Sequence, residues 1–159
     1  MFEPWNNKLE FAEKYPGVRF GEGCLILDDV EIGEGTLIGS HCVIEKHVKI
    51  GKNCSIQTMV NVTSHTIIGN DVFIGPGVKM ANDPFMAMGK LENRLPFRKG
   101  PSLQDGCRIG VGVILLPSIT IGYGAVVGAG SLVTEDIPPF QLWYGSPARF
   151  IRHAGKDRP

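Results

Sequence analysis

Four ionisable residues recur at a constant spacing along the first half of the chain. Asp29, His47, His65 and Asp83 lie eighteen residues apart, and Asn82 stands beside the last of them. A histidine held near a carboxylate can take a proton from a reacting group, because imidazole exchanges protons readily near neutral pH. These residue types therefore predict acid–base chemistry if the fold stacks residues eighteen apart.

A repeat of six residues supplies that stacking. A large apolar residue recurs at every sixth position from Phe20 to Met80, and a smaller residue precedes each by two positions. This period suits neither an amphipathic helix nor long strands joined by hairpins. It fits short strands separated by corners, three to a coil of eighteen residues, with coils stacked about 4.8 Å apart through parallel hydrogen bonds. The sequence therefore predicts an all-β fold, a left-handed parallel β-helix of hexapeptide repeats.

In such a fold the four ionisable residues form one column on the outside of a corner. Asp83 would then lie about one strand spacing from His65 and could orient it. His47 and His65 could equally be exposed corner residues without a chemical role, which are common on the surface of any solenoid. The spacing alone does not decide between these two interpretations.

The period breaks once, next to this column. After Met80 it returns only at Leu103, in a new register. A long loop in a regular solenoid is usually functional or disordered. We therefore expect an excursion from the coil over residues 84–102, with the site at its base.

The chain is expected to form a single domain of five segments. The segments are an N-terminal cap (1–17), coils (18–83), the excursion loop (84–102), further coils (103–137) and a C-terminal tail (138–159). Pro147 would begin a short helix ending at Arg152, since proline suits the first turn of a helix. This tail would cover one open end of the solenoid, which otherwise exposes unpaired strand edges. The other end would be covered by Trp5, Leu9, Phe11 and Tyr15.

Composition argues against several classes of protein. Sixteen basic residues balance sixteen acidic ones, so no strong field would attract nucleic acid or an anionic membrane. No stretch approaches the roughly eighteen apolar residues of a membrane span, and the first residues do not resemble a signal peptide, so we expect a soluble cytoplasmic protein. The four cysteines form no C-x-x-C pair and fall in the column of small inward residues, where they would be buried thiols.

The second half of the chain closely resembles the hexapeptide-repeat acyltransferases. The resemblance rests on residues 109–122, 126–138 and 145–149. It implies a homotrimer, with acetyl-CoA as co-substrate in a groove between adjacent subunits and a small-molecule acceptor. Candidate backbone contacts to acetyl-CoA are near Gly110, Gly112, Gly128 and Gly130. Many members of the family have a lysine where this chain has Glu135, and Arg149 or Arg152 could replace its phosphate contact.

The residues that enter the excursion favour one branch of this family. Sugar O-acetyltransferases typically carry His-Pro here, whereas this chain has Asp83-Pro84. The Asn82-Asp83 pair looks like that of N-acetyltransferases acting on an amino group of a nucleotide-linked sugar, although the Pro-Arg that usually follows is missing. An amine acceptor would attack acetyl-CoA directly. The spacing then makes His65, Asp83 and Asn82 the candidate catalytic residues: His65 as base, Asp83 to orient it, and Asn82 to position the sugar or the acyl carbonyl. His47 and Arg94, the nearest arginine, would bind the substrate.

Several alternatives stay open at this point. The departing CoA thiolate, rather than a side chain, could take the proton of the amine while Asp83 binds the ammonium group. A sugar hydroxyl could be the acceptor instead. The chain could also be a non-catalytic trimeric binding protein, or resemble the γ-type carbonic anhydrases. It lacks the His-x-x-x-x-His pair of those zinc enzymes, so we expect no metal.

Overall fold

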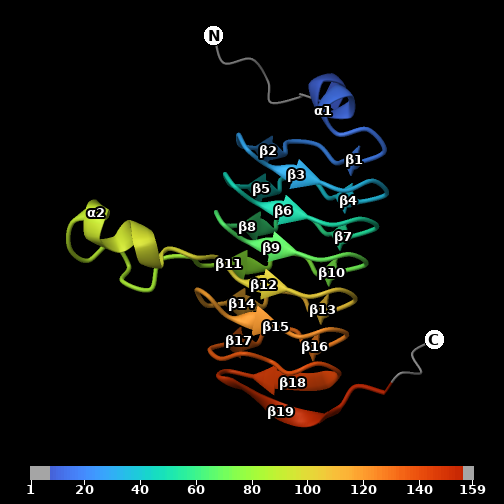
Figure 1. The fold of residues 1–159 in the computed structure, drawn as a ribbon. Helices are drawn as coiled ribbons and strands as arrows, with labels where there is room; N and C mark the ends of the chain where they lie inside the picture. Colours follow the sequence, from blue (N-terminus) through green and yellow to red (C-terminus); the bar gives the residue numbers. More distant parts are fainter. Residues whose placement is uncertain (1–7, 156–159) are drawn as a thin grey trace.

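The computed structural model describes residues 8–155. These residues form a solenoid with three parallel sheets as its faces, which we call sheets A, B and C (Figure 1). Sheet A contains β1 (Arg19–Phe20), β4 (Leu37–Ile38), β7 (Ser55–Ile56), β10 (Phe73–Ile74), β13 (Arg108–Ile109) and β16 (Val126–Val127). Sheet B contains β2 (Leu25–Ile26), β5 (Val43–Ile44), β8 (Asn61–Val62), β11 (Lys79–Met80), β14 (Ile114–Leu115) and β17 (Leu132–Val133). Sheet C contains β3 (Glu31–Ile32), β6 (Lys49–Ile50), β9 (Ile67–Ile68), β12 (Ser102–Leu103) and β15 (Thr120–Ile121).

Along the solenoid, each strand pairs with the strand that lies three places further along the chain, in the same sheet. Arg19 is the partner of Leu37, and Leu37 is in turn the partner of Ser55. The stacking continues across the interruption, because Ile67 pairs with Ser102 on its far side. The predicted parallel β-helix of hexapeptide repeats is therefore confirmed.

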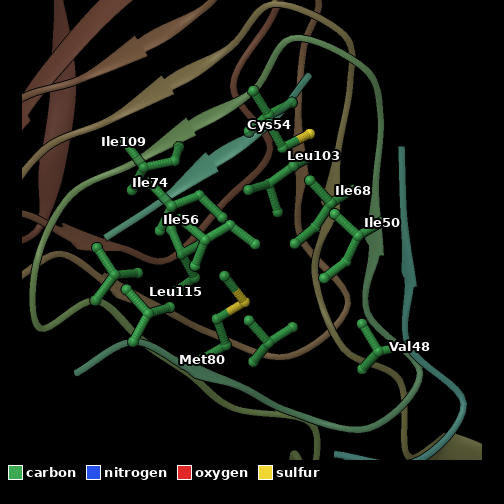
Figure 2. Close-up of a cluster of buried hydrophobic side chains, with 14 of the residues drawn as sticks. Val48, Ile50, Cys54, Ile56, Ile68, Ile74, Met80, Leu103, Ile109 and Leu115 are labelled. Atoms are coloured by element: carbon green, nitrogen blue, oxygen red, sulfur yellow. The ribbon is translucent and has the colours of Figure 1, made fainter. Parts of the chain in front are cut away.

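The interior is filled by the large and small columns of the repeat (Figure 2). Ile56, Ile74 and Ile109 are fully buried, and each contributes roughly 1.5–3 kcal/mol to stability through burial. All four cysteines are free and buried, as predicted. The thiol of Cys54 donates a hydrogen bond to the carbonyl of Gly69 at 3.1 Å. The cysteines thus serve as small core residues.

Most corners turn through a residue with positive φ. His41, His47 and His65 occupy this position, with φ of 57°, 60° and 61°. Histidine, asparagine and aspartate are enriched among the non-glycine residues with this conformation. Backbone geometry is therefore one reason for finding histidines at these corners.

The two ends of the solenoid are covered differently. At the N-terminal end α1 (Lys8–Lys14) brings Phe11 and Tyr15 within 5.1 and 5.9 Å of the Phe20 ring, measured between ring centroids. Trp5 and the side chain of Leu9 lie outside the described residues. At the C-terminal end β18 (Gln141–Gly145) extends sheet A and pairs with β19 (Ala148–His153) in an antiparallel hairpin.

The predicted helix from Pro147 to Arg152 is wrong. Pro147 lies in the turn of the hairpin, and the residues after it pair with β18. Strand pairing gives hydrogen-bond partners to backbone N–H and C=O groups that would have none at the ends of a short helix. Tertiary context therefore overrides the local preference. No helix within residues 8–155 has the length and apolar character needed to cross a membrane.

The excursion projects from the solenoid between β11 and β12 (Figure 1). It contains α2 (Leu91–Arg94), followed by a 3₁₀ turn, η1 (Leu95–Phe97). It departs from the corner between sheets B and C, where Asp29, His47 and His65 lie. We call this the excursion corner.

Candidate functional site

The excursion leaves and rejoins the solenoid through a neck formed by Asn82 and Lys99. The amide of Lys99 donates to the carbonyl of Asn82 at 2.9 Å. The Asn82 side chain is buried, and its Nδ2 donates to the carbonyl of Ser64 at 3.4 Å. Gly100 follows directly, and a Cβ there would lie 2.8 Å from the backbone nitrogen of Thr66. The neck is therefore packed tightly against the coil that precedes it.

Asp83 organises the first turn of the excursion. Its carboxylate accepts hydrogen bonds from the amides of Phe85, at 2.9 Å, and Ala87, at 3.3 Å, and forms an ion pair with Arg94. Desolvation raises the pKa of Asp83, but these amides and the Arg94 guanidinium outweigh it and hold the pKa below its ordinary value. The Arg94 side chain is only 13% exposed. Arg94, expected to bind substrate, is thus engaged inside the loop.

The two histidines of the excursion corner lie together. The rings of His47 and His65 stack with centroids 4.9 Å apart and planes at 20°. His47 Nδ1 lies 3.6 Å from Oδ2 of Asp29. Both histidine side chains are exposed. The spacing of eighteen residues thus brings these three side chains to one place.

The pairing of Asp83 with His65 differs from the expectation. Across residues 8–155 no hydrogen bond or ion pair joins these two side chains, because the Asp83 carboxylate is directed to Arg94 and the loop amides. At Asp83 the chain has already left the coil, so the eighteen-residue stacking no longer applies to it. The carboxylate beside the stacked histidines is that of Asp29.

A cleft of about 510 Å³ opens between the excursion and the outer face of sheet C. It is lined by His47, Lys49, His65, Ile67, Pro96, Arg98 and Lys99. A smaller cleft of about 230 Å³ shares His47, His65 and Arg98 with it and also contacts Lys46, Ser64 and Leu95. The sequence had not marked Lys49 for this site, although it lies eighteen residues before Ile67 on the same face. The arrangement offers two imidazoles and several cations to one ligand.

The candidate glycines fall into two groups. A Cβ on Gly110 would lie 2.5 Å from the amide nitrogen of Ala129, and one on Gly128 would lie 2.5 Å from the ring of Tyr144. These two glycines are explained by close packing between coils. Gly112 and Gly130 instead have φ of 66° and 69°, and a Cβ on either would contact nothing within 4 Å.

Gly112 and Gly130 line one bare corner, which also contains Gly77 and lies between sheets A and B. We call it the glycine corner. It is a different corner from the excursion corner, and neither cleft includes its residues. A single chain therefore does not bring the candidate donor-binding glycines to the histidines.

Arg149 lies on the hairpin at the C-terminal end. It is exposed and forms an ion pair with Glu135 at 2.9 Å. The charges of these two residues therefore partly neutralise each other. In the described part of the chain, no group of three or more His, Cys, Asp or Glu residues is placed to hold a metal ion.

Two family models match the repeat. "Bacterial transferase hexapeptide (six repeats)" matches residues 47–82. "Hexapeptide repeat of succinyl-transferase" matches residues 29–64 and 103–135. Together they cover both halves of the solenoid on either side of the excursion.

Known proteins agree with these matches. A putative acetyltransferase from Schizosaccharomyces pombe is 59% identical over 51 residues, which are 32% of this chain and 25% of that protein. The matched stretch thus spans about a quarter of such curated relatives. A solved putative acetyltransferase from Bacillus cereus is 26% identical, with a TM-score of 0.72 over 89% of this chain and 77% of its own.

A variant of perosamine N-acetyltransferase from Caulobacter crescentus, solved with CoA and GDP-perosamine, is 25% identical. Its TM-score is 0.71, over 86% of this chain and 58% of its own. The repeat, the strand topology and these matches lead to one conclusion. The chain belongs to the hexapeptide-repeat transferase family.

Proposed function

We propose that the protein is an acetyl-CoA-dependent acetyltransferase that acts on an amino group of a nucleotide-linked sugar. The observation that carries this proposal is the stacked pair of His47 and His65 at the cleft beneath the excursion. Support comes from the similarity to an N-acetyltransferase solved with CoA and a nucleotide-linked sugar. The Asp83-Pro84 sequence, in place of the His-Pro of sugar O-acetyltransferases, favours an amine over a hydroxyl acceptor.

In the proposed reaction His65 acts as the general base. An amine must be neutral to attack the thioester carbonyl, and His65 takes the proton that the nitrogen loses as the C–N bond forms. The C–S bond then breaks and the CoA thiolate leaves, receiving the proton in its turn. General base catalysis of this kind contributes typically 10²–10⁴-fold to the rate.

The other candidate residues divide by what they contact. His47 stacks on His65 and lines both clefts, so we assign it to substrate binding. Asn82 and Asp83 hold the neck and the first turn of the excursion, so we assign them to positioning. Arg94 supports Asp83 in the same way.

A homotrimer would complete this site. At the glycine corner three successive coils present a glycine with open space beside it, where the acyl donor could approach the backbone, but this is a different corner from the one that carries His65. A second copy that places its glycine corner against the excursion would join the two. Exposed apolar side chains on the solenoid, including Met59, Ile67 and Ile114, are consistent with such an interface. We place this trimer in the cytoplasm, where acetyl-CoA is used.

A thiol-release screen tests this function. Purified protein would be given acetyl-CoA with a panel of nucleotide-linked amino sugars and, as matched controls, the same sugars with a hydroxyl in place of the amine. We expect CoA release with at least one amino sugar and a product heavier by one acetyl group. Release only with the hydroxyl counterparts would identify an O-acetyltransferase, and no release with any acceptor would contradict the proposal.

A further inference from the structure

The cleft beneath the excursion carries more positive than negative charge. Its lining contains Lys49, Arg98 and Lys99 besides the two histidines, and it contains no aspartate or glutamate. Lys49 has a nearby acid, Glu31, at 2.9 Å. None of the ion pairs within residues 8–155 involves Arg98 or Lys99. Arg98 and Lys99, which lie together in the lining of the cleft, therefore have no carboxylate as an ion-pair partner among the described residues.

Arg98 is the most constrained of these cations. Its side chain is half-buried, and its Nε is buried without a hydrogen-bond partner. The one hydrogen bond described for its side chain runs from a terminal nitrogen to Oδ1 of Asn82 at 3.5 Å, at the long limit for such a bond. A buried donor without an acceptor destabilises a fold, more so when it is charged. Most donors of the Arg98 guanidinium therefore have no described partner.

Arg98 also stands where a ligand could reach its terminal nitrogens. It borders both clefts, and both contain His47 and His65. The fork of a guanidinium matches two oxygens of one phosphate, and a neighbouring lysine adds charge without demanding a fixed geometry. Asn82, which closes the neck, accepts the weak hydrogen bond from Arg98, so the guanidinium lies at the base of the excursion.

We infer that the larger cleft beneath the excursion is a phosphate-binding site. Arg98 contacts the phosphoryl oxygens there, and Lys99 and Lys49 flank them. The inference rests on the proposed function for the origin of the phosphate, since a nucleotide-linked sugar and CoA both carry a diphosphate. It goes beyond that function by assigning ligand binding to residues on the exit of the excursion. It also explains why the excursion rejoins the coil through a basic segment.

Binding measurements on the purified, assembled protein test the inference. The probes are uridine diphosphate and CoA, each titrated by calorimetry into wild type, Arg98→Gln, Lys99→Gln and Lys90→Gln. Lys90 is the matched control, because it is an exposed cation of the same excursion and lies 3.9 Å from Glu92. We expect at least one probe to bind wild type and Lys90→Gln alike, and to bind Arg98→Gln about tenfold or more weakly. Lys99→Gln changes an exposed side chain and should leave the fold intact, with a smaller loss of affinity in the same direction.

The two probes identify the source of the phosphate. A loss confined to uridine diphosphate assigns the site to the acceptor, and a loss confined to CoA assigns it to the donor. Equal affinities in wild type, Arg98→Gln and Lys99→Gln, or no binding of either probe to wild type, would overturn the inference. Arg98-dependent binding without any thiol release would instead refute the proposed function and leave the phosphate site standing.

Discussion

The histidines at the corners can be explained by backbone conformation, by a role at the site, or by both. His41 and His65 share the same place in the repeat and nearly the same φ, so backbone tolerance explains both. His65 also stacks on His47 and lines the cleft beneath the excursion. The spacing of the sequence predicted this stacking. It could not predict the partner of Asp83, because that residue has left the coil and takes its contacts from the excursion.

The four cysteines give a prediction at the same scale. Burial raises the pKa of Cys42 to about 11 and that of Cys107 to about 12, and the thiolate is the reactive form. We expect native protein to react only slowly with a thiol reagent near neutral pH, and all four cysteines to react after unfolding in guanidinium. Rapid reaction of the native protein would show that the interior is open to solvent.

Among the elements, the excursion differs most from the regular coil. Its place in the chain could be predicted, because a break in a strict period is visible in sequence. Its bounds could not, because Asp83 has already left the coil and Ser102 already pairs with Ile67 in the solenoid. Its internal helix and turn could not, since neither contains a buried residue that would give an amphipathic pattern. The excursion is stabilised instead by the Asp83–Arg94 ion pair and by the edge-on contact of Phe85 with Phe97, whose ring centroids lie 5.6 Å apart.

Replacing Asp83 by asparagine tests this description of the excursion. The change keeps the size of the side chain and removes the charge that faces Arg94. We expect faster amide hydrogen exchange over residues 85–97 and a raised KM, with the melting temperature of the solenoid nearly unchanged. Glu92→Gln is the matched control, because Glu92 is an exposed acid of the same loop. Unchanged exchange in Asp83→Asn would contradict the role given to this carboxylate.

The lowered pKa of Asp83 also sets the pH range of this effect. A carboxylate whose pKa is lower in the folded than in the unfolded state stabilises the fold fully above the unfolded value, which is about 3.9. That stabilisation is lost as pH falls through the lower, folded value. Protection of the excursion in wild type should therefore be constant from about pH 5 to 7 and decline only below about pH 4.

At the scale of the whole molecule, the fold follows from a local rule repeated along the chain. Each coil needs only its own apolar residues and its neighbours, so one sequence sufficed to predict the solenoid. The C-terminal hairpin escaped prediction because its pairing with β16 and between its own strands is a tertiary effect. In the proposed trimer, the second half of the site would come from a neighbouring copy, which one chain does not contain.

The dependence of the solenoid on its interior can be measured directly. Leu115 is fully buried, and Leu115→Ala should lower the free energy of unfolding by about 2–5 kcal/mol. Leu91, which is 52% exposed in the excursion, provides the matched control, and Leu91→Ala should cost less than about 1 kcal/mol. Chemical denaturation compares the two. Equal effects would mean that the interior does not determine stability.

The central claim is that His65 is the base for acyl transfer, and the turnover of two histidine variants tests it most directly. His65→Ala and His41→Ala remove the same side chain from the same position of the repeat, at different corners of the solenoid, so their melting temperatures should match. With an acceptor identified by thiol release, kcat of His65→Ala should fall at least about a hundredfold, while that of His41→Ala should stay near wild type. Near-normal turnover in a folded His65→Ala protein would contradict the claim and leave the CoA thiolate as the proton acceptor.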